Sequence, residues 1–250
     1  MAESSKIAWT DNTFNPWIGC SKVSPGCAHC YAETLVKGRM GRPGLWGPQG
    51  QRQVTSGDNW KKPLSWNRKA IRDGRRIRVF CGSLCDWMED QPVANATRPR
   101  LLDLIRSTTH LDWQLLTKRP DRIKDNLPPD WGQGWPNVWL GTSIENNDYA
   151  ARADDLRRIP SVVRFISYEP ALGPLDCLDL TGIHWVIYGG ESGPGFRAED
   201  KQWARDILAR CRDAGVAFFH KQSAGFRTET GIELDGQIVR EYPGTVRGWA

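Results

Sequence analysis

Three cysteines lie within eleven residues near the N-terminus of the chain. Cys20, Cys27 and Cys30 fall in "GCSKVSPGCAHCYAE", residues 19–33, with His29 directly before the last of them. Clustered thiolates at short spacings are ligands for zinc or for iron–sulfur clusters. The glycines and the proline between them predict a loop, where buried thiols are not needed for packing. The spacing therefore predicts metal or redox chemistry at this loop.

The overall composition sets the context for these cysteines. The chain of 250 residues is 39% hydrophobic and 25% charged, with a mean hydropathy of -0.55, which is typical of a globular protein. Its N-terminus has no basic stretch followed by an apolar one, and no window approaches about eighteen consecutive apolar residues. We therefore expect a cytoplasmic location and no membrane role. In a reducing compartment, clustered cysteines bind metal or do redox chemistry more often than they form disulfides.

Two kinds of metal site compete for the cysteine loop. A closed zinc site needs a fourth protein ligand, which His29 or the pair Cys81 and Cys85 would have to supply. His29 is poorly placed for this role because it directly precedes Cys30. In a [4Fe–4S] cluster, three cysteines would leave one iron without a protein ligand and open to chemistry. S-adenosylmethionine can chelate such an iron and be cleaved there to a 5′-deoxyadenosyl radical.

Short apolar runs recur along the chain, and each ends in small or polar residues. Such runs are typical of buried parallel strands, and helical periodicity between them predicts βαβ units. With "FNPWIG" as a short first strand, the sequence predicts one α/β domain over residues 1–250, a partial (β/α)6-type TIM barrel. The predicted strands are 77–83, 113–119, 137–143, 163–169, 184–192 and 216–222, and the predicted helices are 93–109, 147–158 and 200–214.

Two segments fall outside this alternation. Residues 38–62 are rich in glycine and basic side chains and show no helical or strand period, which predicts a flexible Gly/Arg-rich insertion. It would serve as a lid, as an arm for a polyanion, or as a plain surface loop. In the C-terminal extension, residues 226–250, Asp235 and Gly236 predict the turn of a β-hairpin.

Polar side chains follow every predicted strand of the barrel. In TIM barrels the loops after the strands carry the chemistry, so these side chains are expected to meet at one end of the sheet. They are Ser83, Thr117, Lys118, Arg119, Ser143, Glu145, Glu169, Glu191, Ser192, Lys221 and Gln222. The net charge of +5 is compatible with an anionic partner without requiring one. The thirteen tryptophans either fill the core or stack on nucleobases.

The loop "CSKVSPGCAHC" resembles a lengthened radical SAM cysteine motif. In that superfamily two cysteines separated by two residues follow a first one, and an aromatic residue, here His29, precedes the last. In the superfamily three residues usually separate the first two cysteines, whereas six residues separate Cys20 and Cys27 in this chain. The chain further resembles a group of phage and prophage proteins of radical SAM type with a C-x6-C-x2-C motif, from which "CGSLC", residues 81–85, departs. The matching stretches are "TFNPWIGCSKVSPGCAHCYAE", "WQLLTKRPDRI", "NVWLGTSIEN", "RFISYEPALGPL", "WVIYGGESGPGFR" and "FFHKQ".

This resemblance implies a role for each candidate residue. Cys20, Cys27 and Cys30 would bind a [4Fe–4S] cluster, and a flavodoxin or ferredoxin would reduce it. S-adenosylmethionine would meet His29 at its adenine, Ser83 at its amino group, and Ser143 and Glu145 at its ribose. Gly189 and Gly190 would let the backbone approach the adenine or the substrate, or would only form a tight turn. The resemblance leaves Lys118, Glu169, Glu191 and Lys221 as catalytic candidates, and Arg119 and Gln222 as substrate-binding candidates.

The phage setting suggests DNA as the substrate and a bacterial host cytoplasm as the location. One candidate reaction is isomerisation of an amino-acid-modified thymine, with the base flipped into the barrel and the 38–62 arm and tryptophans holding the DNA. A radical SAM enzyme acting on a small molecule or peptide would use the arm as a lid. A zinc-stabilised nucleic-acid-binding module would have no catalysis. Cys81 and Cys85 are ordinary substitutions relative to that group, a spare metal-binding pair, or ligands of a second cluster, and we favour the first, because two thiols are too few to hold a cluster alone.

Overall fold

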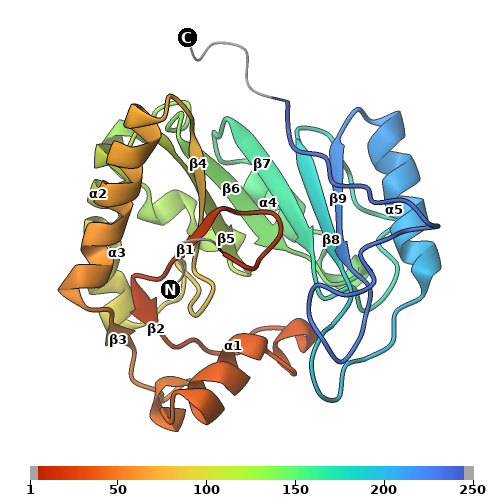
Figure 1. Cartoon of the computed structure of the whole chain (residues 1–250), viewed down its shortest axis with the longest axis horizontal. Helices are drawn as coiled ribbons and strands as arrows, with labels where there is room; N and C mark the ends of the chain where they lie inside the picture. The colour runs from red at the N-terminus through yellow and green to blue at the C-terminus, as the bar shows by residue number, and fades with distance from the viewer. Residues whose placement is uncertain (1–4, 245–250) are drawn as a thin grey trace.

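In the computed structural model of the chain, residues 5–244 are described, and a seven-stranded parallel sheet forms their centre. The strand order β1-β4-β5-β6-β7-β8-β9 follows the chain, so the sheet curves into a half-barrel (Figure 1). The α/β fold and the partial barrel predicted from the sequence are confirmed, and each of the six predicted runs forms a strand. The strands are β1 Asn12–Phe14, β4 Ile77–Cys81, β5 Leu111–Thr117, β6 Val138–Ser143, β7 Val163–Tyr168, β8 Trp185–Gly189 and β9 Ala217–Gln222.

The first strand of the sheet lies earlier than predicted. β1 pairs with β4, whereas the "FNPWIG" stretch provides β2, Trp17–Ile18, which pairs antiparallel with β3, Gln53–Val54, in a separate two-stranded sheet. β2 therefore ties the start of the cysteine loop to the end of the 38–62 segment. That pairing depends on residues far along the chain, which a local sequence pattern does not reveal.

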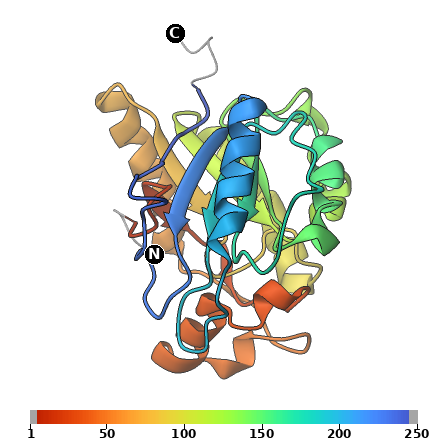
Figure 2. The same cartoon turned by 90° about the vertical axis from the view of Figure 1, so that its right-hand side faces the viewer.

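The helices that cover the sheet each bury one face, and capping side chains fix where several of them begin. Asp200 caps α5 by accepting a hydrogen bond from the Gln202 amide. Figure 2 shows α5 packed against the strands β8 and β9. The helices are α1 Tyr31–Thr34, α2 Gly57–Arg72, α3 Pro92–Ser107, α4 Arg152–Arg157 and α5 Lys201–Asp213, with one π-helical turn, Leu35–Arg39. Short 3-10 turns are Pro25–Cys27, Pro43–Leu45, Pro120–Arg122, Lys124–Asn126, Pro129–Trp131 and Asn147–Tyr149.

The 38–62 segment has regular structure that its composition did not indicate. It includes a 3-10 turn, the strand β3 and the first turns of α2. Trp60, Pro63, Trp66 and Ala70 are the buried face of α2, so its helical period starts inside the segment and continues beyond it. The prediction that residues 38–62 have no secondary structure was therefore wrong. The boundary at residue 62 falls inside α2, so the helical spacing of its buried residues could not be seen within the segment alone.

Aromatic side chains fill the concave side of the half-barrel. Phe80, Phe165 and Phe219 point inward from their strands and pack with Trp185 and with Trp9 of the N-terminal segment. Figure 1 shows this segment crossing in front of the sheet. Most of the thirteen tryptophans are buried in the core. Packing therefore accounts for most of them, and they are not available to stack on a nucleic acid.

The C-terminal extension contains the predicted turn but only a rudimentary hairpin. Asp235 and Gly236 both have positive φ, 52° and 76°, and one antiparallel bridge closes over them. The chain beyond does not extend this hairpin, because it pairs with β9 instead through a bridge from Arg240 to Phe219. Residues 245–250 of the predicted extension lie outside the described residues. Within residues 5–244 no helix is both long and apolar enough to span a bilayer.

Candidate cofactor and substrate site

A cavity of about 350 Å³ opens at the carboxyl ends of the strands. The cysteine loop and α1 lie across this end of the sheet (Figures 1 and 2). The structure thus brings most of the predicted site residues to one space, although Glu145, Gly189 and Gln222 do not line it. The predicted residues that line it are Cys20, Cys27, His29, Cys30, Ser83, Lys118, Arg119, Ser143, Glu169, Gly190, Glu191 and Lys221.

The three thiols of the loop are free and partly exposed. Cys27 ends a 3-10 turn, and Cys30 is the residue from which α1 starts. Burial raises the pKa of Cys30, and burial together with the carboxylates of Asp86 and Glu89 raises that of Cys20. Because metals bind thiolates, loading this loop must release protons.

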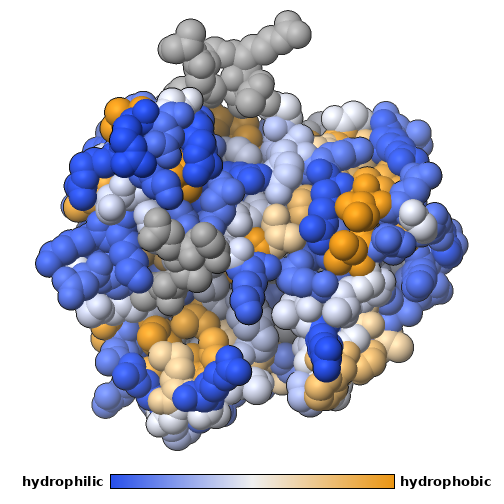
Figure 3. Space-filling model, viewed as in Figure 1, coloured by the Kyte–Doolittle hydropathy of each residue, from blue (hydrophilic) through white to orange (hydrophobic). Residues whose placement is uncertain are grey.

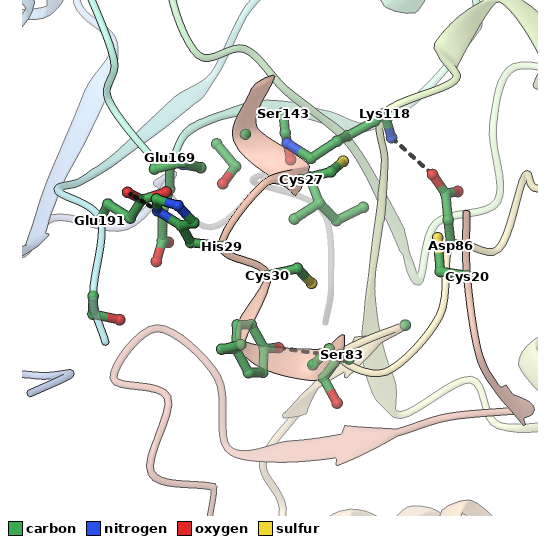
Figure 4. A pocket seen from close by; sticks show the side chains of 18 of the residues that line it. Cys20, Cys27, His29, Cys30, Ser83, Asp86, Lys118, Ser143, Glu169 and Glu191 are labelled. Atoms are coloured by element: carbon green, nitrogen blue, oxygen red, sulfur yellow. Dashed lines mark hydrogen bonds and ion pairs between the residues drawn. The ribbon is translucent and has the colours of Figure 1, made fainter. Parts of the chain in front are cut away.

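The chemistry of this donor set fits a cluster better than a single ion. Among residues 5–244 no group of three or more His, Cys, Asp or Glu side chains is close enough to hold one metal ion. Figure 4 shows the thiols of Cys20, Cys27 and Cys30 on different sides of one space. In a [4Fe–4S] cluster each thiolate binds a different iron, so the three sulfur atoms need not meet at one point.

Glu145 fastens the cysteine loop from inside. Its carboxylate is fully buried and accepts hydrogen bonds from Ser24 Oγ at 2.6 Å, Lys118 Nζ at 2.5 Å and Arg152 Nη1 at 2.9 Å. A Cβ at Gly26 would lie 2.5 Å from Glu145 Oε1, so the loop passes this carboxylate without room for a side chain. Glu145 is therefore placed to position the loop and does not line the cavity, contrary to its predicted contact with a ribose.

A second set of ion pairs fastens the loop at Cys20. Arg119 binds Asp86 at 2.7 Å and donates to the Ser21 carbonyl at 3.0 Å. The Ser21 hydroxyl donates to Glu89 at 2.6 Å, and Glu89 binds the buried Arg52 at 2.7 Å. Arg119, predicted to bind substrate, is thus already paired with protein groups. Since Arg52 also donates to three carbonyls of residues 45–50, the same network fixes part of the 38–62 segment.

The last turn of the cysteine loop is held by Glu191. His29 Nδ1 lies 3.0 Å from Glu191 Oε2, a contact drawn in Figure 4. Arg197 binds both oxygens of Glu191 and donates to the Pro25 carbonyl at 3.1 Å. Burial acts to raise the pKa of Glu191, but the Arg197 and His29 contacts outweigh it and lower the pKa to about 2. Glu191 is therefore a permanent anion that orients His29.

Hydroxyl groups face the cavity from the strand ends. Ser83 Oγ accepts a hydrogen bond from Asn15 at 2.8 Å, and its carbonyl accepts one from Tyr31 at 2.8 Å. Ser143 and Ser167 are register partners on β6 and β7, and both line the cavity. These two hydroxyls have no recorded side-chain hydrogen bond within residues 5–244, so they are available to a ligand.

The remaining predicted residues are occupied by protein contacts. Lys221 forms an ion pair with Glu169. Gln222 is fully buried and donates to the Gly190 carbonyl at 2.9 Å, so it cannot reach a substrate in the cavity. A Cβ at Gly190 would lie 2.1 Å from Ala224 N, and one at Gly189 would lie 3.0 Å from the Glu169 carboxyl carbon. The close approach that these glycines allow is thus to the protein's own chain.

Several residues of the site were missed in the sequence. Asp86 and Glu89 follow β4 in "DWMED" and could have been found by the strand-end rule that selected Ser83. Arg197 and Arg52 carried no such signal, because only the fold brings them to the loop. Cys85 was expected to be a plain substitution, yet it is buried and lines the cavity.

The chain was compared with known protein families, curated proteins and solved structures. The chain belongs to the family described as "Protein of unknown function (DUF5131)", which it matches over residues 4–243. A solved structure of spore photoproduct lyase complexed with dinucleoside spore photoproduct has a similar fold, with a TM-score of 0.50 and 13% identity. A doubly substituted mutant of that lyase, with bound AdoMet and dinucleoside spore photoproduct, has a TM-score of 0.47 and 13% identity. In both cases 83% of this chain is covered but only 62% of the lyase chain. No curated protein matches significantly.

Proposed function

We propose that this member of the DUF5131 family is a radical SAM enzyme. Cys20, Cys27 and Cys30 would hold a [4Fe–4S] cluster, with S-adenosylmethionine as the second cofactor. The observation that carries the proposal is that three free thiols of one loop line a single cavity at the carboxyl end of a parallel half-barrel. When bound, these cofactors supply a 5′-deoxyadenosyl radical through one-electron cleavage of the sulfonium.

The side chains around the cavity would bind the cofactor and exclude water. His29, held by Glu191, is the candidate for the adenine, and Ser83 is the candidate for the methionyl amino group. Ser143, together with Ser167 beside it, would bind the ribose hydroxyls. A flavodoxin or ferredoxin would supply the electron. The ion pair of Lys221 and Glu169 lines the cavity and would then remain for the substrate.

For the substrate we propose a base in DNA, and for the reaction the isomerisation of an amino-acid-modified thymine. Support comes from the spore photoproduct lyase of similar fold, whose structure contains a dinucleoside. The isomerisation is tested by incubating the reconstituted, reduced enzyme and S-adenosylmethionine with an oligonucleotide that carries the modified thymine. Isomerisation predicts a nucleoside with changed chromatographic retention and unchanged mass, and a changed mass would contradict it.

A small molecule or peptide is the second candidate substrate. The cavity of about 350 Å³ is in the range that fits a small ligand. Its buried or half-buried basic side chains Lys118, Arg119 and Lys221 are paired with carboxylates, so its interior does not favour a polyanion, although the exposed Lys6 also lines it. This candidate predicts radical chemistry without affinity for DNA.

Anaerobic reconstitution with iron and sulfide tests the radical SAM proposal. We expect wild-type protein to turn brown and to release 5′-deoxyadenosine after reduction with S-adenosylmethionine present. Cys27→Ala should lose both properties. Cys177→Ala is the matched control, because Cys177 is exposed and bonds Asn147 instead of lining the cavity. A colourless protein with tightly bound zinc would contradict the proposal and favour the zinc-stabilised module.

A further inference from the structure

The tripeptide Gly-Phe-Arg occurs twice, at residues 195–197 and 225–227. The first follows β8 and the second follows β9, the next strand of the sheet. The two loops lie side by side, because Gly193 N donates to Gly225 O at 3.1 Å and Gly225 N donates to Glu191 O at 3.0 Å. Figures 1 and 2 show both loops at the end of the sheet that carries the cysteine loop.

Both phenylalanines of this repeat are exposed. Phe196 is 38% exposed and Phe226 is 67% exposed, whereas the inward aromatic residues of the half-barrel are buried. Figure 3 shows hydrophobic surface over the loops at the lower right of this face. Folding gains little from the burial of Phe226, and Phe196, although more than half covered, still leaves 38% of its surface in water.

The two loops border the cavity. Ser192, which precedes the first phenylalanine, and Thr228, which follows the second, both line it. The two exposed rings are therefore attached to chain segments that form the edge of the proposed active site. A ligand that enters the cavity from outside must pass this edge.

Unpaired positive charge also lies at this edge. Lys6 lines the cavity and is exposed, and Arg227 is exposed next to Phe226. Neither has a recorded ion pair within residues 5–244. Lys118 and Lys221, by contrast, are neutralised inside the cavity by buried or half-buried carboxylates. The two cations and the exposed rings therefore lie on or next to segments that line the cavity: Lys6 is part of the lining, and Arg227 lies between Phe226 and the lining residue Thr228.

We propose that Phe196 and Phe226 stack on unpaired bases of a single-stranded DNA segment, while Lys6 and Arg227 contact its phosphates. Exposed rings beside free cations are the combination that binds single strands, because every base offers a face to stack on and the backbone is anionic. A duplex hides these base faces. The choice of DNA rests on the proposed function, in which one base of the strand enters the cavity.

Fluorescence anisotropy with labelled oligo(dT) and the reconstituted full chain tests this inference. The variant carrying Phe196→Ala and Phe226→Ala should bind about fivefold to 150-fold more weakly for each ring that stacks. Leucine at both positions should weaken binding similarly, whereas tryptophan should preserve it. Arg227→Ala should reduce the slope of log Kd against log salt by about 0.7.

Two matched controls separate the site from general surface effects. Ile71→Ala removes a side chain that is 53% exposed near the end of α2, and Arg212→Ala removes an exposed positive charge in the last turn of α5. Both lie near the opposite end of the sheet, where β4 and β9 begin, and both should leave binding unchanged. Circular dichroism of every variant checks that the fold is retained.

The possible outcomes are distinct. Unchanged affinity in the double alanine variant overturns the inference, as does equal binding by the leucine and tryptophan variants. Tighter binding of duplex DNA or of oligo(U) RNA also overturns it. If wild-type protein releases 5′-deoxyadenosine but does not bind oligo(dT), the inference fails while the radical SAM proposal holds. If binding depends on the rings but no 5′-deoxyadenosine forms, the inference holds and the radical SAM proposal fails.

Discussion

Replacing Glu145 by glutamine removes one charge from the centre of the site while keeping the shape of the side chain. The carboxylate is fully buried between Lys118 and Arg152 and also accepts the hydroxyl of Ser24 in the cysteine loop. An amide has only one acceptor oxygen, and its NH2 group must face a cationic partner. The variant therefore leaves a positive charge without its counter-ion.

The expected loss follows from the burial of the two partners. The side chains of Lys118 and Arg152 are only 19% and 12% exposed, so little water replaces the lost carboxylate. Breaking a buried pair costs about 3–5 kcal/mol. We expect the free energy of unfolding of Glu145→Gln to fall by about 3 kcal/mol, the lower end of this range, because both cations retain some access to water. A smaller iron content after reconstitution should accompany it, since Ser24 is held less firmly.

Urea denaturation of the iron-free protein under anaerobic, reducing conditions measures this loss. The matched control is Asp130→Asn, which breaks an exposed pair with Arg106 and should lower the free energy of unfolding much less than Glu145→Gln does. A loss below about 1 kcal/mol for Glu145→Gln at neutral pH would refute the reasoning that this carboxylate anchors the loop.

The pH dependence of the loss provides a second check. Burial acts to raise the pKa of Glu145, but Lys118, Ser24 and Arg152 outweigh it and hold the pKa below the ordinary 4.5. A carboxyl with a depressed pKa stabilises the fold above its unfolded pKa and loses this effect as pH falls through its folded pKa. The difference between wild type and Glu145→Gln should therefore be full at neutral pH and should shrink below about pH 4.5. A constant difference across this range would contradict the assignment.

Three further changes test other parts of the site. Gly26→Ala places a Cβ 2.5 Å from Glu145 Oε1, so it should lower the free energy of unfolding by about 1–3 kcal/mol and reduce the iron content after reconstitution. Urea denaturation and iron analysis measure these two effects, and wild-type values for both would contradict the close packing. Cys85→Ala should leave the iron content unchanged, unlike Cys27→Ala, and a loss equal to that of Cys27→Ala would make Cys85 a cluster ligand. Wild-type protein should be stabilised by ionised Glu191 above about pH 4.5 and should lose this stabilisation toward pH 2, whereas Glu191→Gln should lack it throughout. Thermal stability measured across this pH range tests the prediction, and identical profiles for the two proteins would refute the depressed pKa of Glu191.

The strands were predictable because their sequence signal is local. A buried parallel strand is apolar on both faces, so "WQLLT" and "VRFISY" are recognisable without knowledge of their neighbours. The cysteine loop was predictable for the same reason, since its three cysteines are close in sequence. The antiparallel pairing of β2 was missed because it depends on β3, and the start of α2 was missed because it lies in a segment with unusual composition.

The roles of charged residues could be predicted only in part. The strand-end rule correctly brought Lys118, Glu169 and Lys221 to one cavity. It could not tell which charges neutralise one another, because ion pairing depends on side-chain directions that the fold sets. Arg197, which binds Glu191, lies in a loop several residues beyond the end of β8, where the strand-end rule does not reach. Sequence reasoning therefore brought these residues to one cavity, whereas its substrate-binding candidates Arg119 and Gln222 are bound to protein groups in the structure.

The polar groups at the strand ends fall into two sets: carboxylates that hold the cysteine loop, and hydroxyls that face the cavity. Glu145 and Glu191 bind side chains of the cysteine loop directly, Asp86 holds the loop through Arg119, and each carboxylate is paired with at least one arginine. The partners of Glu145 and Glu191 hold the pKa of each carboxyl below its ordinary value, so these two groups stay ionised near neutral pH and are suited to positioning rather than to general acid–base catalysis. Ser143 and Ser167 lack such partners within the described chain and face the cavity. The loop is thus positioned by three anchors that do not depend on bound iron, and the groups left for ligand binding are neutral hydroxyls inside the cavity and free cations at its edge.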